Sequence, residues 1–475
     1  MNFQRVTTSD TIELVDQSEE DKSTDFLSKN ISSRFPEAIA AKLCRQFIDI
    51  NRTNLSKVGV EARTKYDGSK VSLTFTSSLN IGAVPLLSPI TSKHSISLLI
   101  KPRFGWNGIG SILQRTGWKE IPEILHLPQL TISERRIPQW VLSSVILHRL
   151  DRLLRKLGRK FQMTDKQQSI PKGQVNWVAY ATKSLPKANY LDFECRYPSL
   201  QENSKIKSYI KFTLLSQRNS LETQRDQGIY VLQLVDFCKK LESELIGTIS
   251  QKPDANDLIL GSDAIPHAND FDKGIEAIVW STENAGLAGL GDLNGLPWSL
   301  SMEKLFESYI ESVFQKLTQQ FGGSIKSGRK HETLIPIQWD PPFIGSQNSL
   351  IPDIIIERDG EEIIIDAKYK NHWEELTVNR WYNLSDEIKK HHRNDILQLL
   401  AYSSVSGKSK ISCCLIYPCK RATYEKLKKT GRLFNSAQIS HDHRKISFHL
   451  TAIPFNITDD ELDYLSPLFK DSDTI

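Results

Sequence analysis

The stretch Pro352-Asp-Ile-Ile-Ile-Glu-Arg-Asp-Gly-Glu-Glu-Ile-Ile-Ile-Asp-Ala-Lys368 decides the fold that we expect for this chain. Two β-branched runs flank the dipeptide Asp359-Gly360. Asp-Gly between such runs is a strong hairpin signal, because a type I′ turn needs a positive φ at both central positions. Both runs are continuously apolar, which predicts strands that are covered on both faces.

The two-residue turn fixes the register of this hairpin. It places Asp353 directly opposite Asp366, and opposed residues on one face have Cβ atoms roughly 4.5–5.5 Å apart. Lys368 lies two residues beyond Asp366 and therefore points to the same face. The sequence thus predicts two carboxylates and one ammonium group at the open end of the hairpin.

This grouping of charges predicts a metal-dependent catalytic site. Two carboxylates held so close repel each other, so one is protonated or a cation lies between them. Aspartate oxygens with no nearby thiol or paired histidine favour Mg²⁺ or Mn²⁺, and such an ion polarises a phosphodiester and activates water. We expect Asp353 and Asp366 to hold the metal, and Lys368 to orient or deprotonate the water or to stabilise the phosphate. The alternative is a surface hairpin with a cross-strand Asp–Lys ion pair.

Glu307 is a candidate for the same site. It lies on an amphipathic helix expected over residues 301–317, whose apolar stripe faces a core. The alternative is that Glu307 belongs to an exposed ladder of acids with Glu303 and Glu311.

Gln398 is a second accessory candidate. It interrupts the apolar run 396–400 on a helix expected over about residues 385–404, with Tyr402 one helical turn further on. A buried glutamine at this position needs a partner, either at the metal site or on the backbone.

The remaining elements predict a mixed α/β protein of two or three domains. We expect strands near 351–357, 362–368, 411–417 and 445–452 in the C-terminal part, and a strand over 95–100 in a strand-rich region of about 36–130. Helices are expected near 109–118, 137–160 and 201–245, with a linker at about 250–272.

The helix expected over 137–160 has a basic face that includes Arg149, Arg152, Lys156 and Arg159. This face is either a phosphate-contacting stripe or an ordinary solvated helix face.

Composition narrows the class of protein. The net charge is +5, which is compatible with nucleic-acid binding. The six cysteines show no metal-binding spacing, which indicates reduced thiols and a cytoplasmic location. No apolar run approaches the roughly 20 residues of a membrane span, so we expect no membrane association. Residues 323–330 lack the lysine and the Ser/Thr of a P-loop, so the chain is not expected to carry its own nucleotide motor.

Five blocks of this sequence together resemble the McrC family, the nuclease subunit of McrBC-type modification-dependent restriction systems within the PD-(D/E)xK nucleases. They are Met302-Glu-Lys-Leu-Phe-Glu307, Pro352-Asp353, Asp366-Ala-Lys-Tyr-Lys370, Asp395-Ile-Leu-Gln-Leu-Leu-Ala-Tyr402 and Leu415-Ile-Tyr-Pro418. The resemblance implies a restriction-endonuclease-like fold and a nuclease triad of Asp353, Asp366 and Lys368, with Glu307 and Gln398 as accessory positions. It also implies that DNA is cut only in assembly with a hexameric AAA+ GTPase of the McrB type.

The resulting domain hypothesis has three parts. Residues 1–35 are expected to form an acidic mobile tail with one short strand near 11–15, residues 36–272 an α+β partner-binding region, and residues 273–475 the PD-(D/E)xK nuclease domain. Two other functions stay open: a self-sufficient restriction or repair nuclease, and a non-catalytic adaptor of an AAA+ ring.

Overall fold

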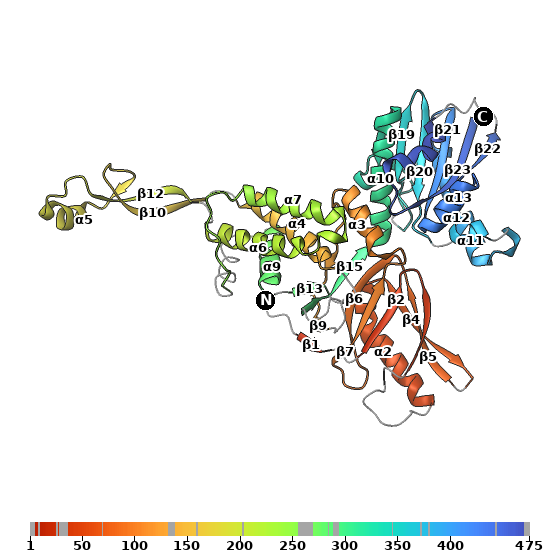
Figure 1. The fold of residues 1–475 in the computed structure, drawn as a ribbon, viewed down its shortest axis with the longest axis horizontal. Coiled ribbons are helices and arrows are strands. Elements are labelled where there is room, and N and C mark those ends of the chain that lie inside the picture. The colour runs from red at the N-terminus through yellow and green to blue at the C-terminus, as the bar shows by residue number, and fades with distance from the viewer. Residues whose placement is uncertain are drawn as a thin grey trace. The chain divides into compact units, whose positions relative to one another are not determined.

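The chain forms two compact units in the computed structural model (Figure 1). One comprises residues 142–285, and the other comprises residues 2–141 together with 286–475. The structure describes residues 5–7, 10–24, 27, 37–68, 70–131, 138–157, 160–201, 204–254, 269–283, 285–287, 294–343, 345–370, 373–378, 381–441 and 444–469. The units therefore divide the chain after residues 141 and 285, whereas the sequence suggested divisions after residues 35 and 272.

The larger unit contains a five-stranded sheet of order β2-β7-β6-β15-β8 and a three-stranded sheet of order β3-β5-β4. Their strands are β2 (Asp10–Val15), β3 (Glu19–Ser23), β4 (Val60–Asp67), β5 (Lys70–Ser77), β6 (Asn80–Leu87), β7 (His94–Lys101), β8 (Glu123–Ile124) and β15 (Trp298–Ser301). The strand expected over 95–100 is thus confirmed as β7. The helix expected near 109–118 begins earlier, as α3 (Gly105–Arg115).

Helix α2 (Glu37–Lys57) was not predicted, since the region from residue 36 onward was expected to be strand-rich. Its buried side chains Cys44, Phe47 and Leu55 recur at helical spacing and lie in the core. The helix packs against strands β4, β5 and β6. These tertiary contacts stabilise it more than its modest local signal suggests.

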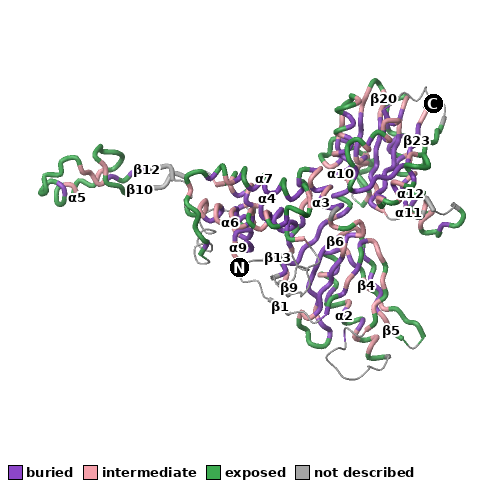
Figure 2. The backbone as a smooth tube through the Cα atoms, in the orientation of Figure 1, coloured by how far each residue is buried: buried purple, intermediate pink, exposed green. Residues whose placement is uncertain are grey.

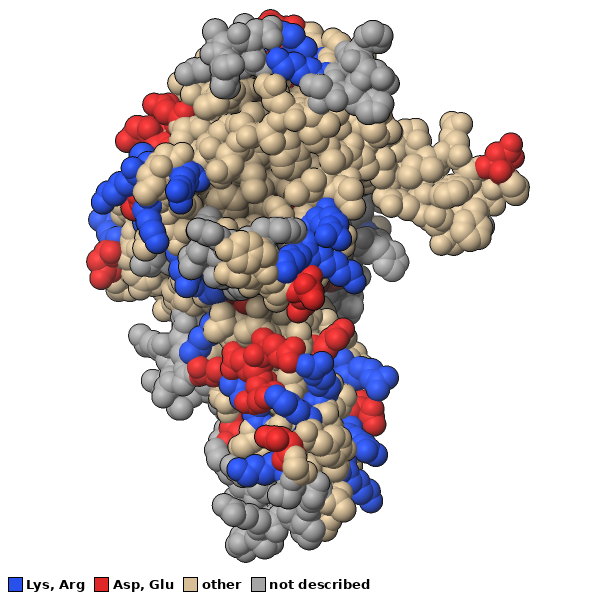
Figure 3. Space-filling model, turned by 90° about the vertical axis from the view of Figure 1, so that its right-hand side faces the viewer, with Lys and Arg blue, Asp and Glu red and all other residues tan. Residues whose placement is uncertain are grey.

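Residues 10–23 form two strands where the sequence suggested a mobile acidic tail with one short strand. The short strand expected near 11–15 is β2, which pairs in parallel with β7. The acids of β3 form ion pairs across its sheet, with 2.5 Å between Arg63 and Glu19 and a further pair between Lys65 and Asp21. Figure 3 shows acidic and basic side chains intermixed in the lower part of the face in view. Opposite charges on β4 therefore hold the acidic segment in place.

The C-terminal part of this unit is a six-stranded mixed sheet of order β16-β19-β20-β21-β23-β22. Its strands are β16 (Ser324–Ser327), β19 (Ile354–Arg358), β20 (Glu361–Ala367), β21 (Lys410–Cys419), β22 (Phe434–His441) and β23 (Arg444–Pro454). Strands β20, β21 and β23 are parallel, and helices α12 (Asp386–Ser404) and α13 (Arg421–Lys429) lie in the crossovers. The four strands predicted for this region and the mixed α/β class are confirmed.

The β19–β20 hairpin has the predicted register. Ile354 pairs with Ile365, and Arg358 pairs with Glu361. Asp359 and Gly360 have φ values of 47° and 82°, as a type I′ turn requires. All six isoleucines of the hairpin are buried, so both faces are covered, as expected (Figure 2).

Helix α10 (Met302–Phe321) opens the C-terminal part and follows directly after β15. The Ser301 hydroxyl caps it by accepting a hydrogen bond from the Lys304 N–H. Smaller elements of the unit are β1 (Arg5–Thr7), β9 (Gln129–Thr131), β14 (Asn294–Leu296), β17 (Ile335–Pro336), β18 (Ser349–Leu350) and α11 (Trp373–Val378).

The smaller unit combines helices with a long hairpin (Figure 1). Its elements are α4 (Trp140–Lys156), α6 (Ser204–Glu222), α7 (Ile229–Ser243), α9 (Asn269–Thr282), and the sheet of β10 (Lys160–Gln168), β12 (Phe193–Gln201) and β11 (Gln174–Val175). Strand β13 (Ala285–Leu287) begins at the last residue of this unit and belongs to the four-stranded sheet of order β1-β9-β14-β13. Most of the linker expected over 250–272 lies outside the described residues. No helix in the described ranges is long and apolar enough to span a membrane.

Arg149 shows that the basic face of α4 is partly structural. Its guanidinium lies 2.8 Å from Glu276 and 4.3 Å above the ring of Trp280, both on α9. Arg149 therefore packs within the unit instead of facing a ligand. Arg159, the last member of the face, lies outside the described residues.

Candidate active site

The structure brings Asp353, Asp366 and Lys368 together at the open end of the β19–β20 hairpin. Asp366 lies on β20 with 0% of its surface exposed, and the Lys368 Nζ is 2.8 Å from its Oδ2. Asp353 immediately precedes β19, and its Oδ2 accepts a hydrogen bond of 2.8 Å from the backbone N–H of Ala367. That N–H lies between Asp366 and Lys368 in sequence, so the three side chains share one small region.

Burial and mutual repulsion dominate the electrostatics of this group. Burial raises the pKa of Asp353 well above its usual value, and the charges of Asp366 and Glu307 raise it further. Burial also raises the pKa of Asp366, while Lys368 opposes that shift. Burial alone lowers the pKa of Lys368, but the charges of Asp366 and Asp353 raise it above its usual value. The site thus holds two carboxylates that a single lysine only partly compensates.

The donor set fits a divalent cation of the Mg²⁺ type. Among the described residues, Asp366 Oδ1 is buried and has no hydrogen-bond partner. A buried carboxylate oxygen without a donor is costly, and a cation satisfies it. The described residues contain no ready-made cluster of three His, Cys, Asp or Glu side chains for a metal. Mg²⁺ is usually held by one or two carboxylates together with waters and substrate phosphates, so two aspartates suffice for it.

Glu307 lies on α10 within electrostatic reach of this group. Burial raises its pKa to about 7, helped by the charge of Glu303, while Arg329 and Lys368 act in the opposite direction. Glu307 is half-buried, so it is not part of a uniformly exposed ladder of acids. Glu311, the next member of that ladder, is buried and lies 3.6 Å from Arg329.

Gln398 is exposed, and the expectation of a buried glutamine is therefore wrong. Its Nε2 donates a hydrogen bond of 2.7 Å to the hydroxyl of Tyr402, which in turn donates to the carbonyl of Ile351 at 3.3 Å. Burial raises the pKa of Tyr402, and the charge of Asp366 contributes to that shift. Gln398 thus contacts the surroundings of the site through Tyr402. Residues 396–400 do not form a continuous buried run, and Gln398 lies on the exposed side of the helix.

Residues 293–418 match the model of a protein family described as McrBC 5-methylcytosine restriction system component. Over this segment, the chain is similar to the McrBC family. The matched segment contains all five residues of the predicted site, and the McrC-like resemblance read from the sequence is confirmed. No curated protein matches the sequence.

Two solved structures are similar to this chain at low identity. One is a refined half-complex from a tetradecameric assembly of Thermococcus gammatolerans McrB AAA+ hexamers with bound McrC. It is 12% identical, covers 96% of this chain and 99% of that chain, and has a TM-score of 0.40. The other is a Thermococcus gammatolerans McrBC complex, which is 13% identical, covers 64% and 87% of the two chains, and has a TM-score of 0.26. Because both TM-scores lie below 0.5, the likeness to the McrBC family rests on the matched segment.

The McrBC-family segment holds a second charged group that the sequence analysis missed. Lys370 Nζ lies 2.5 Å from Asp395 Oδ1, and the Tyr417 hydroxyl donates to Asp395 Oδ2 at 2.9 Å. The charge of Asp395 raises the pKa of Asp366, so the two groups interact. Two features of the sequence could have indicated this pair. Lys370 lies two residues beyond Lys368, and Asp395 lies one helical turn before Gln398.

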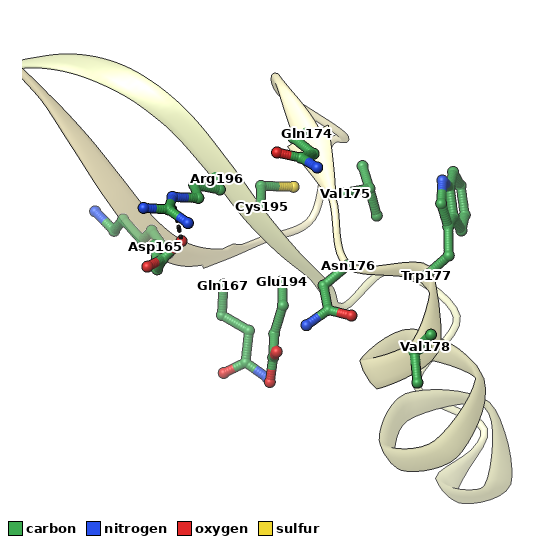
Figure 4. Close-up of a pocket in the computed structure, with 11 residues that line it drawn as sticks. Asp165, Gln167, Gln174, Val175, Asn176, Trp177, Val178, Glu194, Cys195 and Arg196 are labelled. Atoms are coloured by element: carbon green, nitrogen blue, oxygen red, sulfur yellow. Dashed lines mark ion pairs between the residues drawn. The ribbon is translucent and has the colours of Figure 1, made fainter.

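A separate open pocket of about 880 Å³ lies on the hairpin of the smaller unit, outside the McrBC-family segment (Figure 4). Side chains from β10, β11 and β12 line it, among them Gln167, Gln174 and Glu194. An ion pair of 3.7 Å joins Asp165 and Arg196 at its edge. None of the predicted site residues lines this pocket.

Proposed function

We propose that this chain is the nuclease subunit of an McrBC-type restriction system, which hydrolyses DNA phosphodiesters with the help of Mg²⁺ or Mn²⁺. The observation that carries the proposal is the fully buried Asp366, whose Oδ1 lacks a hydrogen-bond partner among the described residues, beside Asp353 and Lys368. A buried carboxylate oxygen without a hydrogen-bond donor destabilises the fold, so a core retains one chiefly where it has a use.

In this proposal each side chain has a distinct task. Asp353 and Asp366 hold the divalent ion, which supplies Lewis-acid polarisation of the phosphate and an activated water. Lys368, aimed by its ion pair with Asp366, orients or deprotonates the attacking water or stabilises the phosphate charge in the transition state. Glu307 and Gln398 are accessory positions: Glu307 acts through its charge, and Gln398 acts through Tyr402.

We propose an McrB-like AAA+ GTPase hexamer as the partner and cytoplasmic DNA as the substrate. The family description, a restriction system component, supports a multi-subunit assembly. The McrC-like blocks of the sequence support the kind of partner. Residues 323–330, the nearest P-loop candidate, lack the lysine and the Ser/Thr of that motif, which fits a motor supplied by another protein.

We place the partner-binding surface in the region 36–272, on the hairpin of the smaller unit. Its tip exposes several large apolar side chains, namely Ile170, Trp177, Val178, Tyr190 and Leu191. Trp177 and Val178 project from the short helix beside the pocket (Figure 4). Clustered exposed apolar side chains of this size are typical of protein-interaction sites.

The decisive experiment is a cleavage assay on the chain and on its co-purified AAA+ partner. Mg²⁺-dependent cutting of modified DNA that needs both proteins and GTP supports the proposal. Robust cutting by the chain alone favours a self-sufficient nuclease instead. A chain that assembles with the partner but never cuts, and shows no Mg²⁺ or Mn²⁺ affinity by calorimetry, is a non-catalytic adaptor.

A further inference from the structure

Tyr369 lies between two lysines that both contact carboxylates of the candidate site. Lys368 pairs with Asp366 at 2.8 Å, and Lys370 pairs with Asp395 at 2.5 Å. The backbone N–H of Lys370 donates to the carbonyl of Lys368 at 2.8 Å, which closes a three-residue turn around Tyr369. Because the turn is so short, any displacement of Tyr369 moves both lysines.

Tyr369 itself is held by residues from the N-terminal part of the larger unit. Its hydroxyl donates to Asp16 Oδ2 at 2.6 Å, and its carbonyl accepts a hydrogen bond of 2.7 Å from Gln17 Nε2. The guanidinium of Arg103 lies 4.3 Å above its ring. The hydroxyl, the backbone and the ring of one residue are therefore all fixed by residues more than 250 positions away in the chain.

This network is deeply buried and joined within itself. Asp16 is 1% exposed and Tyr369 is 2% exposed. Asp16 Oδ1 accepts from the backbone N–H of Arg103 at 2.6 Å, and the Nη1 of Arg103 donates to the Gln17 side chain at 2.5 Å. Within this network a displacement of Tyr369 leaves the buried carboxylate of Asp16 without one of its donors, so the hydrogen bonds oppose such a movement.

We propose that Tyr369 is a positioning residue, through which Asp16 and Gln17 hold Lys368 and Lys370 in the geometry that phosphodiester cleavage requires. The inference rests on the proposed function, because it gives Tyr369 a role in that cleavage. The residues that follow strand β2 then belong to the support of the active site, although they lie at the opposite end of the sequence. A shift of β2 relative to the C-terminal sheet changes the placement of both lysines.

Two variants test this role. Tyr369→Phe removes the hydroxyl that bonds to Asp16 and keeps the ring. Gln17→Asn shortens the side chain that holds the Tyr369 carbonyl, and asparagine tolerates the positive φ of 54° at this position. The matched control is Tyr309→Phe: Tyr309 is 1% exposed, and its hydroxyl donates to the carbonyl of Pro454 at 2.8 Å, away from the lysines.

The variants are assayed as full chains in the complex with the AAA+ partner. We expect Tyr369→Phe and Gln17→Asn each to lower kcat for DNA cleavage by about tenfold or more, since small misplacements of catalytic groups cost that much. The KM for DNA, the Mg²⁺ concentration for half-maximal rate and the melting temperature stay close to those of Tyr309→Phe. This split between kcat and the other parameters separates positioning from simple structural support.

Wild-type chain and Asp366→Ala are run in the same experiment. A kcat for both variants equal to that of Tyr309→Phe, with wild type active and Asp366→Ala inactive, overturns the positioning role alone. A kcat that falls only in proportion to the melting temperature, in the control as well, also overturns it. Absence of cutting by wild type, or undiminished cutting by Asp366→Ala, overturns the proposed function and this inference with it.

Discussion

Two buried aspartates of the larger unit, Asp16 and Asp366, have opposite surroundings. Asp16 is 1% exposed, and each of its oxygens has a hydrogen-bond donor, from Arg103 and Tyr369. Asp366 is 0% exposed, yet its Oδ1 has no donor among the described residues and a second carboxylate lies beside it. Burial alone therefore does not mark a functional carboxylate; the missing partner does.

The largest expected effect is on catalysis. Asp366→Ala removes one metal ligand and the partner of Lys368, so cleavage by the assembled complex should fall by at least about 10³-fold. Assembly with the partner, as measured by size-exclusion chromatography, should be unchanged. A variant that still cuts at the wild-type rate shows that the site is assigned to the wrong residues.

The second-largest effect is expected on the free energy of unfolding, when Asp16 is replaced. The Nε of Arg103 lies 3.5 Å from Asp16 Oδ2, and both side chains are buried. Asp16→Ala therefore leaves Arg103 without its carboxylate, and breaking a buried ion pair in this way costs about 3–5 kcal/mol. Urea denaturation monitored by tryptophan fluorescence measures the loss. If Asp366→Ala destabilises the metal-free chain as much as Asp16→Ala does, the contrast between the two aspartates fails.

The sequence predicted the surroundings of Asp366, because they depend on local geometry. The Asp359-Gly360 turn set the register of β19 and β20, and with it the proximity of Asp353, Asp366 and Lys368. The sequence likewise predicted α10, from its apolar stripe, and α12. These features extend over a few residues, so they are readable without knowledge of the fold.

The surroundings of Asp16 could not be predicted in this way, because they depend on contacts between distant parts of the chain. Tyr369 and Asp16 are separated by 353 positions, and no local pattern links them. The same reason explains the missed helix α2, which tertiary packing stabilises, and the pairing of β15 with the N-terminal strand β6. The exposure of Gln398 was missed because the apolar run around it does not show which side of α12 faces the core.

The third prediction concerns the electrostatic repulsion between Asp353 and Asp366. In Asp353→Asn the hydrogen bond from Ala367 can be kept, while one of two crowded, desolvated charges is removed. Because burial and Asp366 raise the pKa of Asp353, its ionised form destabilises the metal-free fold at neutral pH, and its removal is stabilising. In EDTA we expect the melting temperature to rise by roughly 2–4 °C, corresponding to about 1 kcal/mol. A lower melting temperature in EDTA contradicts the repulsion.

The smallest effect is expected at Gln398. It is exposed, and its described link to the site is one hydrogen bond to Tyr402. Gln398→Ala should reduce the cleavage rate by no more than about threefold, in line with the loss of one surface hydrogen bond of about 0.5 kcal/mol. A loss that approaches that of Asp366→Ala makes Gln398 a direct participant in catalysis.

The central claim is that Asp353 and Asp366 together hold a divalent ion. A crystal structure of the chain grown with Mn²⁺, with anomalous diffraction data, locates the metal directly. The account predicts one or more anomalous peaks within roughly 2.0–2.4 Å of carboxylate oxygens of both aspartates. Mn²⁺ bound elsewhere, with both carboxylates free of metal, contradicts it.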